Sequence, residues 1–309
     1  MKKRFNLGVA REQAEKAETA RKTANDKRLA KLQQRSRRIE LRKKNVPLMS
    51  TARDNRETDA EMLSIYDNMH VAATNYFGNV QNVVTPHNRS YALDWLVQVQ
   101  MHFKLSNKSL FLAVNIFDRL LAVQQINHAS VQLTCISSLM IAVKYEQVWP
   151  LSVSDYTFIC GNAYTPRQIC DMERTILGRI DYRLTVPTLS SFLSILCKKY
   201  YGNETLVWLA SYLCELTLLE YSFYKHKPLL VCAACIMVAR MSLGYKAWTK
   251  TLAKHSKCKE GQLRMIASEV ILMHRAAPTS GFQSVREKYS KKGLGNVSAI
   301  KALPLRNTL

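Results

Sequence analysis

Four charged residues stand in or beside stretches of the sequence that are otherwise apolar. Arg89 opens the run RSYALDWL, Asp118 follows NIF, Lys144 closes LTCISSLMIAV, and Glu173 lies within MERTIL. Burying a charge is unfavourable unless it is paired and hydrogen-bonded. Each side chain therefore pairs inside the protein, lies solvated at the rim of the core, or meets a partner. Taken singly, each is best interpreted as a rim charge or an internal ion pair.

The common signatures of catalytic and metal sites do not occur in the sequence. It has no G-x-x-x-x-G-K-[ST], G-x-G-x-x-G, H-E-x-x-H or G-x-S-x-G, and none of its seven histidines stands at ligand spacing from another. Cys232-x-x-Cys235 is the only C-x-x-C pair, and it lies mid-helix with no second ligand pair nearby. We therefore expect no enzyme, no metal and no cofactor.

The composition favours an all-α protein with more than one domain. The chain has 309 residues, 47% of them hydrophobic, with only 10 glycines and 8 prolines. The longest apolar runs, near 133–143 and 228–239, are too short to cross a membrane. The eight cysteines lie mostly in apolar stretches, as free thiols do in a helical core. We expect a soluble intracellular protein with no membrane partner.

The net charge of +22 is concentrated at the ends of the chain. Residues 1–50 carry 16 Lys and Arg against 5 Asp and Glu, which is half of the net charge. A basic tail of this kind either meets acidic partners, such as import receptors, nucleic acid or acidic lipid, or is only a solvated arm. Because the segment has few large apolar residues, we expect it to be disordered.

Apolar residues at helical spacing predict a run of helices after the tail. One amphipathic helix is expected over 58–77. A first set is expected over 89–104, 107–123, 130–145, 152–160 and 165–180, and a second over 190–200, 204–221, 228–243, 249–255 and 260–274. The third helix of each set is apolar nearly all round, which is typical of a helix surrounded by others. The chain from Pro278 onward is expected to be mostly irregular.

The charged residues lie in segments that together resemble the cyclin box. RSYALDWLVQVQMHF resembles the family's opening M-R-x-x-L-V-D-W-L-V-E-V, and LFLAVNIFDRLLAV resembles L-x-L-x-V-x-x-x-D-R-F/Y-L. The next segments of the family's box are resembled by VQLTCISSLMIAVKYEQVWP and by the later stretch that contains MERTIL. The five residues that characterise the box fall on Arg89, Asp118, Leu133, Lys144 and Glu173. The resemblance covers about residues 58–290, and the later FQSVREKYSKKGLGNVSAI resembles the K-Y-S segment of mitotic, A/B-type cyclins.

The resemblance implies a site that docks a cyclin-dependent kinase. It makes Lys144 and Glu173 the polar anchors to the kinase backbone, with Tyr145, Tyr182 and Leu184 as apolar contacts around them. It makes Arg89 and Asp118 an internal pair and Leu133 a structural residue of the box. Such a protein supplies no catalytic group, and instead reorients the kinase helix whose Glu pairs with the ATP-binding Lys.

The family's substrate-docking patch is altered in this sequence. The Met, Ile, Leu, Trp and Glu of the family's opening motif correspond here to Asn88, Tyr91, Ala92, Trp95 and Gln98. Only Trp95 matches, so both the apolar groove and the acid that meets the substrate's Arg are changed. We therefore predict weak docking of R-x-L substrates.

Two segments of the tail resemble regulatory signals. Arg4, Leu7 and Gly8 match the destruction box R-x-x-L-G-x-I-x-N, although Ala10 and Glu12 do not match its later positions. Residues 27–44 have the charge density of a nuclear-import signal. Ubiquitin-ligase machinery and an import receptor are the partners that these signals imply, with a distribution between nucleus and cytoplasm.

The sequence is therefore interpreted as a basic tail (1–57), an N-terminal cyclin box with a preceding helix (58–186), a C-terminal cyclin fold (187–290) and a short tail (291–309). The implied function is binding and activation of a cyclin-dependent kinase in the cell cycle, at G2/M. One alternative is a scaffold that docks a kinase without activating it. Another is a nucleic-acid-binding factor similar to transcription factor IIB, but no zinc ribbon precedes the repeats, so nucleic acid is not an expected partner.

Overall fold

The computed structural model describes residues 84–200 and 203–304, except for the side chains of 198–200 and 255. The chain divides into two units, 1–51 and 52–309, and all the described residues belong to the second. The helix expected over 58–77, the basic tail and its candidate signals lie outside the described residues.

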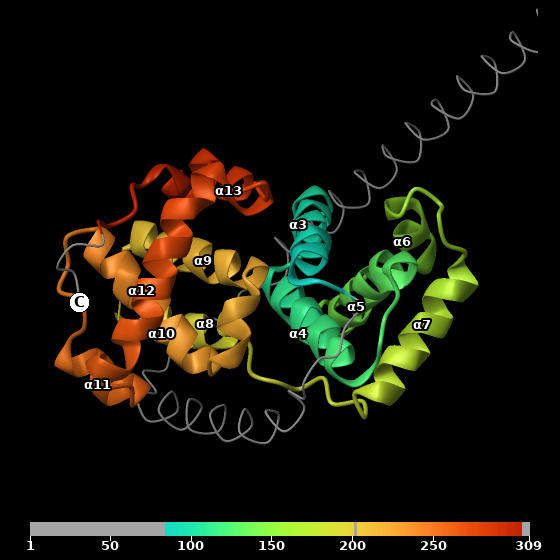
Figure 1. Cartoon of the computed structure of the whole chain (residues 1–309), viewed down its shortest axis with the longest axis horizontal. Helices are drawn as coiled ribbons and strands as arrows, with labels where there is room; N and C mark the ends of the chain where they lie inside the picture. Colours follow the sequence, from blue (N-terminus) through green and yellow to red (C-terminus); the bar gives the residue numbers. More distant parts are fainter. Residues whose placement is uncertain (1–83, 201–202, 305–309) are drawn as a thin grey trace, which may run out of the picture. The chain divides into compact units, whose positions relative to one another are not determined.

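The described part of the chain is helical and contains no strand (Figure 1). The first set of helices is α3 (Pro86–His102), α4 (Asn107–Val123), α5 (Val131–Glu146), α6 (Val153–Ile159) and α7 (Pro166–Arg179). The second set is α8 (Leu189–Tyr200), α9 (Glu204–Leu219), α10 (Pro228–Ser242), α11 (Lys250–Ser256) and α12 (Glu260–Ala276). The expectation of two successive five-helix sets is confirmed.

Local sequence accounts for several of the helix ends. Thr165 precedes Pro166, and its hydroxyl accepts a hydrogen bond from the amide of Gln168, whose side chain in turn accepts one from the Thr165 amide. This reciprocal capping satisfies two backbone donors at the start of α7. Thr85 precedes Pro86 at the start of α3, and its hydroxyl accepts a hydrogen bond from the amide of Asn88.

Each set of helices is built around its third member. α5 packs against α3, α4 and α7, and its residues from Thr134 to Val143 are buried. α10 packs against α8, α9 and α12, and it is buried from Val231 to Ala239. A helix that is apolar all round can satisfy this position, because neighbours cover every side of it.

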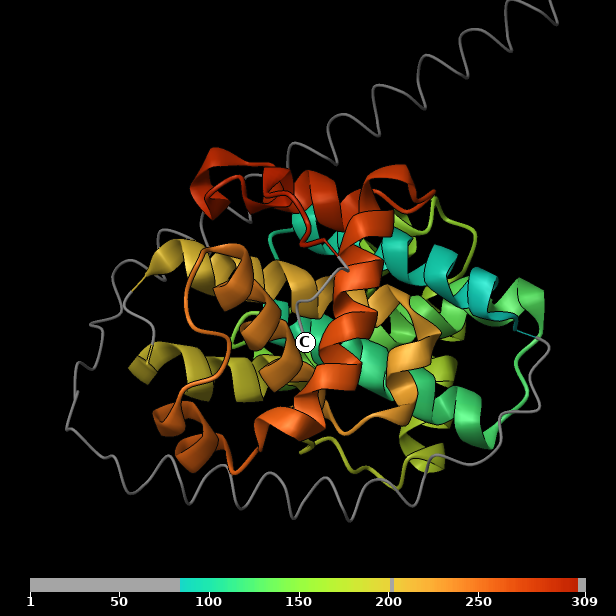
Figure 2. The ribbon, with the colours of Figure 1, turned by 60° about the vertical axis from the view of Figure 1, so that its left-hand side comes forward.

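The end of the chain is more ordered than the sequence suggests. The expectation of irregular chain from Pro278 is wrong for α13 (Ser284–Tyr289), which is followed by the short 3-10 turns η5 (Lys292–Leu294) and η6 (Val297–Ala299). Val285, Tyr289 and Val297 are fully buried. α13 packs against α3 of the first set and α9 of the second, and Figures 1 and 2 both show it beside α3. The C-terminal segment therefore bridges the two sets of helices.

None of the helices in the described part of the chain combines the length and the apolar character that a membrane crossing requires.

Candidate functional site

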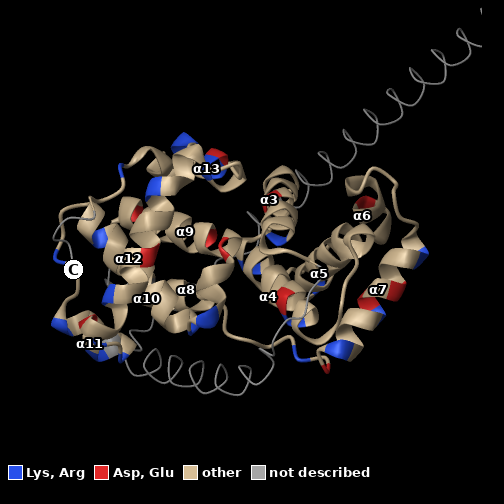
Figure 3. Ribbon diagram, viewed as in Figure 1, with Lys and Arg blue, Asp and Glu red and all other residues tan. Residues whose placement is uncertain are grey.

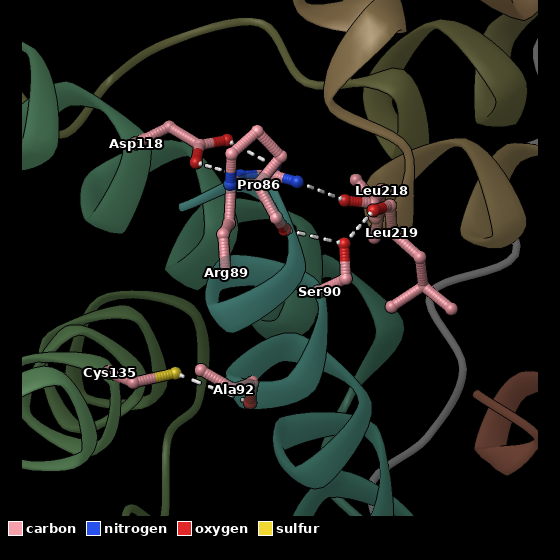
Figure 4. Close-up of polar contacts among 8 residues, drawn as sticks. All are labelled: Pro86, Arg89, Ser90, Ala92, Asp118, Cys135, Leu218 and Leu219. Carbon is pink, nitrogen blue, oxygen red and sulfur yellow. Dashed lines mark hydrogen bonds and ion pairs between the residues drawn. The ribbon is translucent and has the colours of Figure 1, made fainter. Parts of the chain in front are cut away.

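Arg89 and Asp118 form a buried ion pair between α3 and α4. Two nitrogens of the guanidinium donate to the two carboxylate oxygens over 2.7 and 2.8 Å. A third donates to the backbone oxygen of Leu218, 2.9 Å away (Figure 4). Burial lowers the pKa of Arg89, but the charge and hydrogen bonds of Asp118 outweigh this, and the net effect is a raised pKa. The pair is structural, and it also contacts the second set of helices.

Ser90 makes a second link between the two sets. Its hydroxyl lies 2.6 Å from the backbone oxygen of Leu219 and 2.9 Å from that of Pro86 (Figure 4). Leu218 and Leu219 end α9, where backbone oxygens have no partner within the helix. The start of α3 therefore caps the end of α9, and this contact fixes one set of helices against the other.

Lys144 and Glu173 pair at the rim of the first set. Lys144 lies in the last turn of α5, and its ammonium is 2.8 Å from both carboxylate oxygens of Glu173 on α7. The two side chains are 42% and 17% exposed. An ion pair so close to solvent contributes about 0–1 kcal/mol to stability. The geometry is that of a rim ion pair which remains accessible to a partner.

Three other charged residues of α7 pair within the helix, which carries both signs on its surface (Figure 3). Asp171 pairs with Arg174 over 2.8 Å and with Arg167 over 3.8 Å. Glu173 reaches Lys144 on the neighbouring helix instead. This places one carboxylate of α7 at the end of α5.

The three apolar residues expected around this pair lie on the same rim. Tyr145 is exposed, and its hydroxyl is 2.6 Å from the hydroxyl of Thr185 in the segment that follows α7. Tyr182, in that segment, is 69% exposed. Leu184 is half-buried and packs against the core. The ion pair joins α5 to α7, and the hydrogen bond between Tyr145 and Thr185 joins the end of α5 to the segment that carries Tyr182 and Leu184. We call residues 180–186 the linker.

Leu133, the remaining residue of the box, lies in the first turn of α5. It is half-buried and packs against the hydrophobic core. This position agrees with the structural role that the resemblance implies.

Two exposed apolar residues near this rim were not singled out in the sequence. Val148 is 83% exposed and Trp149 is 47% exposed, and both follow directly on the end of α5. Apolar side chains held in water beside a charged pair are typical of an interaction surface. The only sequence signal was two bulky apolar residues in a short loop before Pro150.

The altered docking patch lies along α3. Tyr91 is largely exposed, Ala92 is buried and Trp95 is half-buried. The side-chain amide of Asn88 lies 3.0 Å from the ring nitrogen Nδ1 of His128. Gln98 is exposed, but its amide donates to Ser284 on α13 over 2.9 Å. The two amide side chains of the patch are therefore hydrogen-bonded within the protein, and Gln98 joins the patch to the C-terminal segment.

Asp94 is the acidic residue of α3 and lies between patch residues Ala92 and Trp95. Its carboxylate is hydrogen-bonded within the protein. It accepts hydrogen bonds from the backbone nitrogen of Ser284 over 3.0 Å and from the Ser284 hydroxyl over 2.6 Å. Gln98 also donates to it, over 3.4 Å. Because Asp94 is buried and bonded to the start of α13, its carboxylate is not presented at the surface for an incoming Arg.

Buried cysteines occupy the core of the second set. Cys232 and Cys235 are fully buried on α10, and burial raises the pKa of both thiols well above the usual value. Such thiols are unreactive and serve as small apolar side chains. Among the residues described, no cluster of His, Cys, Asp or Glu has the arrangement of a metal site.

Two family models match the chain one after the other. The cyclin N-terminal domain matches residues 60–185, and the cyclin C-terminal domain matches residues 187–303. The chain belongs to the cyclin family. Its membership confirms the resemblance found in the sequence, and it confirms the tandem all-helical architecture. The family comprises non-catalytic regulatory subunits of kinases, so the expectation that this cyclin is not an enzyme is also confirmed.

Its similar relatives include both B-type and A-type cyclins. It is 39% identical over 221 residues to a G2/mitotic-specific cyclin-B of Marthasterias glacialis, which covers 71% of this chain and 57% of the relative. It is 38% identical over 213 residues to cyclin-B1-3 of Arabidopsis thaliana, covering 69% and 51%. With cyclin-A2-2 of the same plant the identity is 34% over 251 residues, covering 76% and 57%. This cyclin therefore spans about half the length of the curated relatives it matches.

Solved structures with a similar fold include a viral cyclin from herpesvirus saimiri. The TM-score is 0.61 at 21% identity, and the match covers 68% of this chain and 97% of the viral one. The yeast RNA polymerase II CTD kinase complex CTDK-1 also contains a similar chain, with a TM-score of 0.54 at 12% identity and coverage of 71% and 78%. At these identities the likeness is one of fold.

Proposed function

We propose that this cyclin binds and activates a cyclin-dependent kinase through the rim around Lys144 and Glu173. The observation that carries the proposal is an accessible ion pair among exposed apolar side chains, at the two positions that match the anchors of the cyclin box. The pair adds little to stability at this exposure, so its placement suits a role in binding.

Both groups have hydrogen-bonding capacity for a partner's backbone. The Lys144 ammonium has three donors, and the two oxygens of the Glu173 carboxylate accept several hydrogen bonds. The kinase gains these hydrogen bonds only in the conformation that fits this surface, and its apolar side chains are then covered by Tyr145, Tyr182 and Val148. Binding therefore shifts the kinase towards that conformation. Catalysis then belongs to the kinase, whose regulatory helix carries the Glu that pairs with its ATP-binding Lys.

We further propose that this kinase acts at G2/M. Support comes from the mitotic cyclins among the relatives and from the likeness of residues 282–300 to the K-Y-S segment of A/B-type cyclins.

Co-purification with a panel of cyclin-dependent kinases tests the proposal. The Lys144→Ala, Glu173→Ala double variant is expected to lose both the kinase and the histone-type kinase activity. Arg264→Ala, Glu260→Ala is the matched control, since it removes another exposed ion pair, 3.3 Å long, from α12 in the second set of helices. If the Lys144→Ala, Glu173→Ala variant still binds the kinase, the proposed site is wrong. If the wild-type protein binds a kinase that stays inactive, this cyclin is a scaffold and not an activator.

We propose that the basic tail controls location and lifetime, with the protein distributed between nucleus and cytoplasm. The support is the charge density of residues 27–44 and the match of Arg4, Leu7 and Gly8 to a destruction box. Neutralising the basic residues of 27–44 should reduce nuclear signal in a tagged protein. The degradation hypothesis fails if Arg4→Ala, Leu7→Ala leaves the mitotic half-life unchanged.

A further inference from the structure

The turn that ends α7 holds Tyr182 in a backbone conformation that a bulky residue does not favour. The backbone nitrogen of Tyr182 donates to the oxygen of Leu177 over 2.9 Å, and that of Asp181 points to the oxygen of Gly178 at 3.5 Å. This is the Schellman pattern of a helix end. Asp181 and Tyr182 both have positive φ, 54° and 55°. Left-handed backbone is uncommon without glycine, and a bulky residue such as Tyr is an outlier there.

The end of α6 has the same turn with residues that suit it. The backbone nitrogen of Asn162 donates to the oxygen of Thr157 over 3.0 Å, and that of Gly161 to the oxygen of Phe158 over 2.9 Å. Their φ angles are 64° and 61° for Gly161 and Asn162. Glycine and asparagine are the residues that adopt this conformation most readily. The turn after α7 therefore needs stabilisation from elsewhere, and the turn after α6 does not.

Arg119 of α4 contacts the strained turn from inside the protein. It is 2% exposed, and its guanidinium donates to the backbone oxygen of Arg183 over 2.6 Å and to that of Ile180 over 3.1 Å. The two oxygens lie on either side of Asp181 and Tyr182. The planar fork of an arginine can hold two acceptors at once in fixed geometry, and a lysine ammonium cannot reproduce this arrangement.

The same turn carries the most exposed aromatic residue of the docking rim. Tyr182 points into solvent at its strained position, and Leu184 and Thr185 follow it, with Thr185 bonded to Tyr145. An exposed anchor binds better when its backbone is held in the bound conformation beforehand. Arg119 thus contacts this turn from the core, and Tyr182 extends from the same turn into solvent.

We propose that Arg119 is a positioning residue for partner binding, which holds the linker turn so that Tyr182 is presented ready to dock. This inference rests on the proposed function for its partner, the kinase. The clamp itself is a property of the isolated cyclin, so the two can be tested separately.

The test compares Arg119→Lys with Arg89→Lys in the full chain. Both remove a buried guanidinium fork that binds a backbone oxygen, but only Arg119 touches the linker. Amide hydrogen exchange is measured at Tyr182 and Arg183, with Asn162 in the α6 turn as the internal reference. We expect exchange at the two linker amides to accelerate about tenfold in Arg119→Lys, and to stay unchanged in Arg89→Lys and at Asn162.

Kinase affinity is then measured in a double-mutant cycle with Tyr182→Ala. Arg119→Lys should weaken binding about tenfold in the wild-type background and less than about threefold when Tyr182 is already removed. Equal losses in both backgrounds would show a general loss of stability and overturn the positioning role. Unchanged linker exchange would overturn the clamp. A wild-type protein that binds no kinase overturns the proposed function and the docking role with it, while the exchange result still decides whether Arg119 holds the turn.

Discussion

Replacing Lys288 by methionine should destabilise this cyclin strongly, although the residue is in the C-terminal segment. The Lys288 ammonium on α13 lies 2.8 and 2.7 Å from the two carboxylate oxygens of Glu215 on α9, and 2.9 Å from the side-chain oxygen of Asn107 on α4. Glu215 is fully buried and Lys288 nearly so. One cation therefore satisfies a buried carboxylate and joins three helices.

The expected loss follows from what remains after the substitution. Glu215 would keep the hydrogen bond from the hydroxyl of Tyr289, 2.6 Å away, but would lose the cation that balances its charge. Burial raises the pKa of Tyr289 well above its usual value, so the hydroxyl stays protonated and donates. Removing one member of a buried ion pair costs about 3–5 kcal/mol. In a protein of this size that corresponds to a fall in Tm of roughly 6–20 °C.

The assay is unfolding in denaturant, with Tm measured in parallel by calorimetry. Lys291→Met is the matched control, because Lys291 is exposed three residues further on, and its effect should stay within about 0.5 kcal/mol. Adding Glu215→Gln to Lys288→Met removes the stranded charge and should recover a large part of the stability. A loss below about 1 kcal/mol in Lys288→Met would refute the reasoning, as would a Glu215→Gln addition that makes the protein less stable still.

Three further outcomes follow from the structure. Burial and the charge of Arg286 lower the pKa of His274 to about 4, below the ordinary 6.5, so the unfolded chain takes up its proton first. The free energy of unfolding should then fall by up to about 1.4 kcal/mol per pH unit from pH 6.5 towards 4. His274→Asn should flatten this slope when denaturation is measured across that range, and an unchanged slope would contradict the role of His274. Asp181→Gly should raise the free energy of unfolding by about 1 kcal/mol, because glycine relieves the left-handed backbone, and a loss of stability would count against strain in the turn. An R-x-L peptide titrated against the protein should bind weakly even in Gln98→Glu, since Asn88, Tyr91 and Ala92 still replace the apolar residues of the groove; an affinity typical of mitotic cyclins would show that the patch still works.

The helices could be predicted because long apolar stripes are visible in sequence. α4 and α5 bury whole faces, and the structure ends them within one residue of the expected positions. α13 escaped prediction because six residues do not make a stripe. One of the contacts that hold it joins Lys288 to a carboxylate 73 residues earlier, which no local pattern reveals.

The site was predicted only in part, for a similar reason. Lys144 and Glu173 came from resemblance to a family motif, since nothing in their spacing of 29 residues says that they meet. Arg119 matches the Arg of the family segment D-R-F/Y-L, but that match does not say which groups its side chain contacts. Its partners are backbone oxygens, which every residue supplies, and only the folded chain brings them to the guanidinium.

The dissociation constant for the kinase, measured for Lys144→Ala and Glu173→Ala separately, tests the central claim most directly. Each variant should weaken binding at least about tenfold, because it leaves a hydrogen-bonding group of the kinase without its partner. The free energy of unfolding should change by less than about 1 kcal/mol, since the ion pair is exposed. A dissociation constant that stays at the wild-type value in both variants would contradict the assignment of this rim as the kinase-docking site.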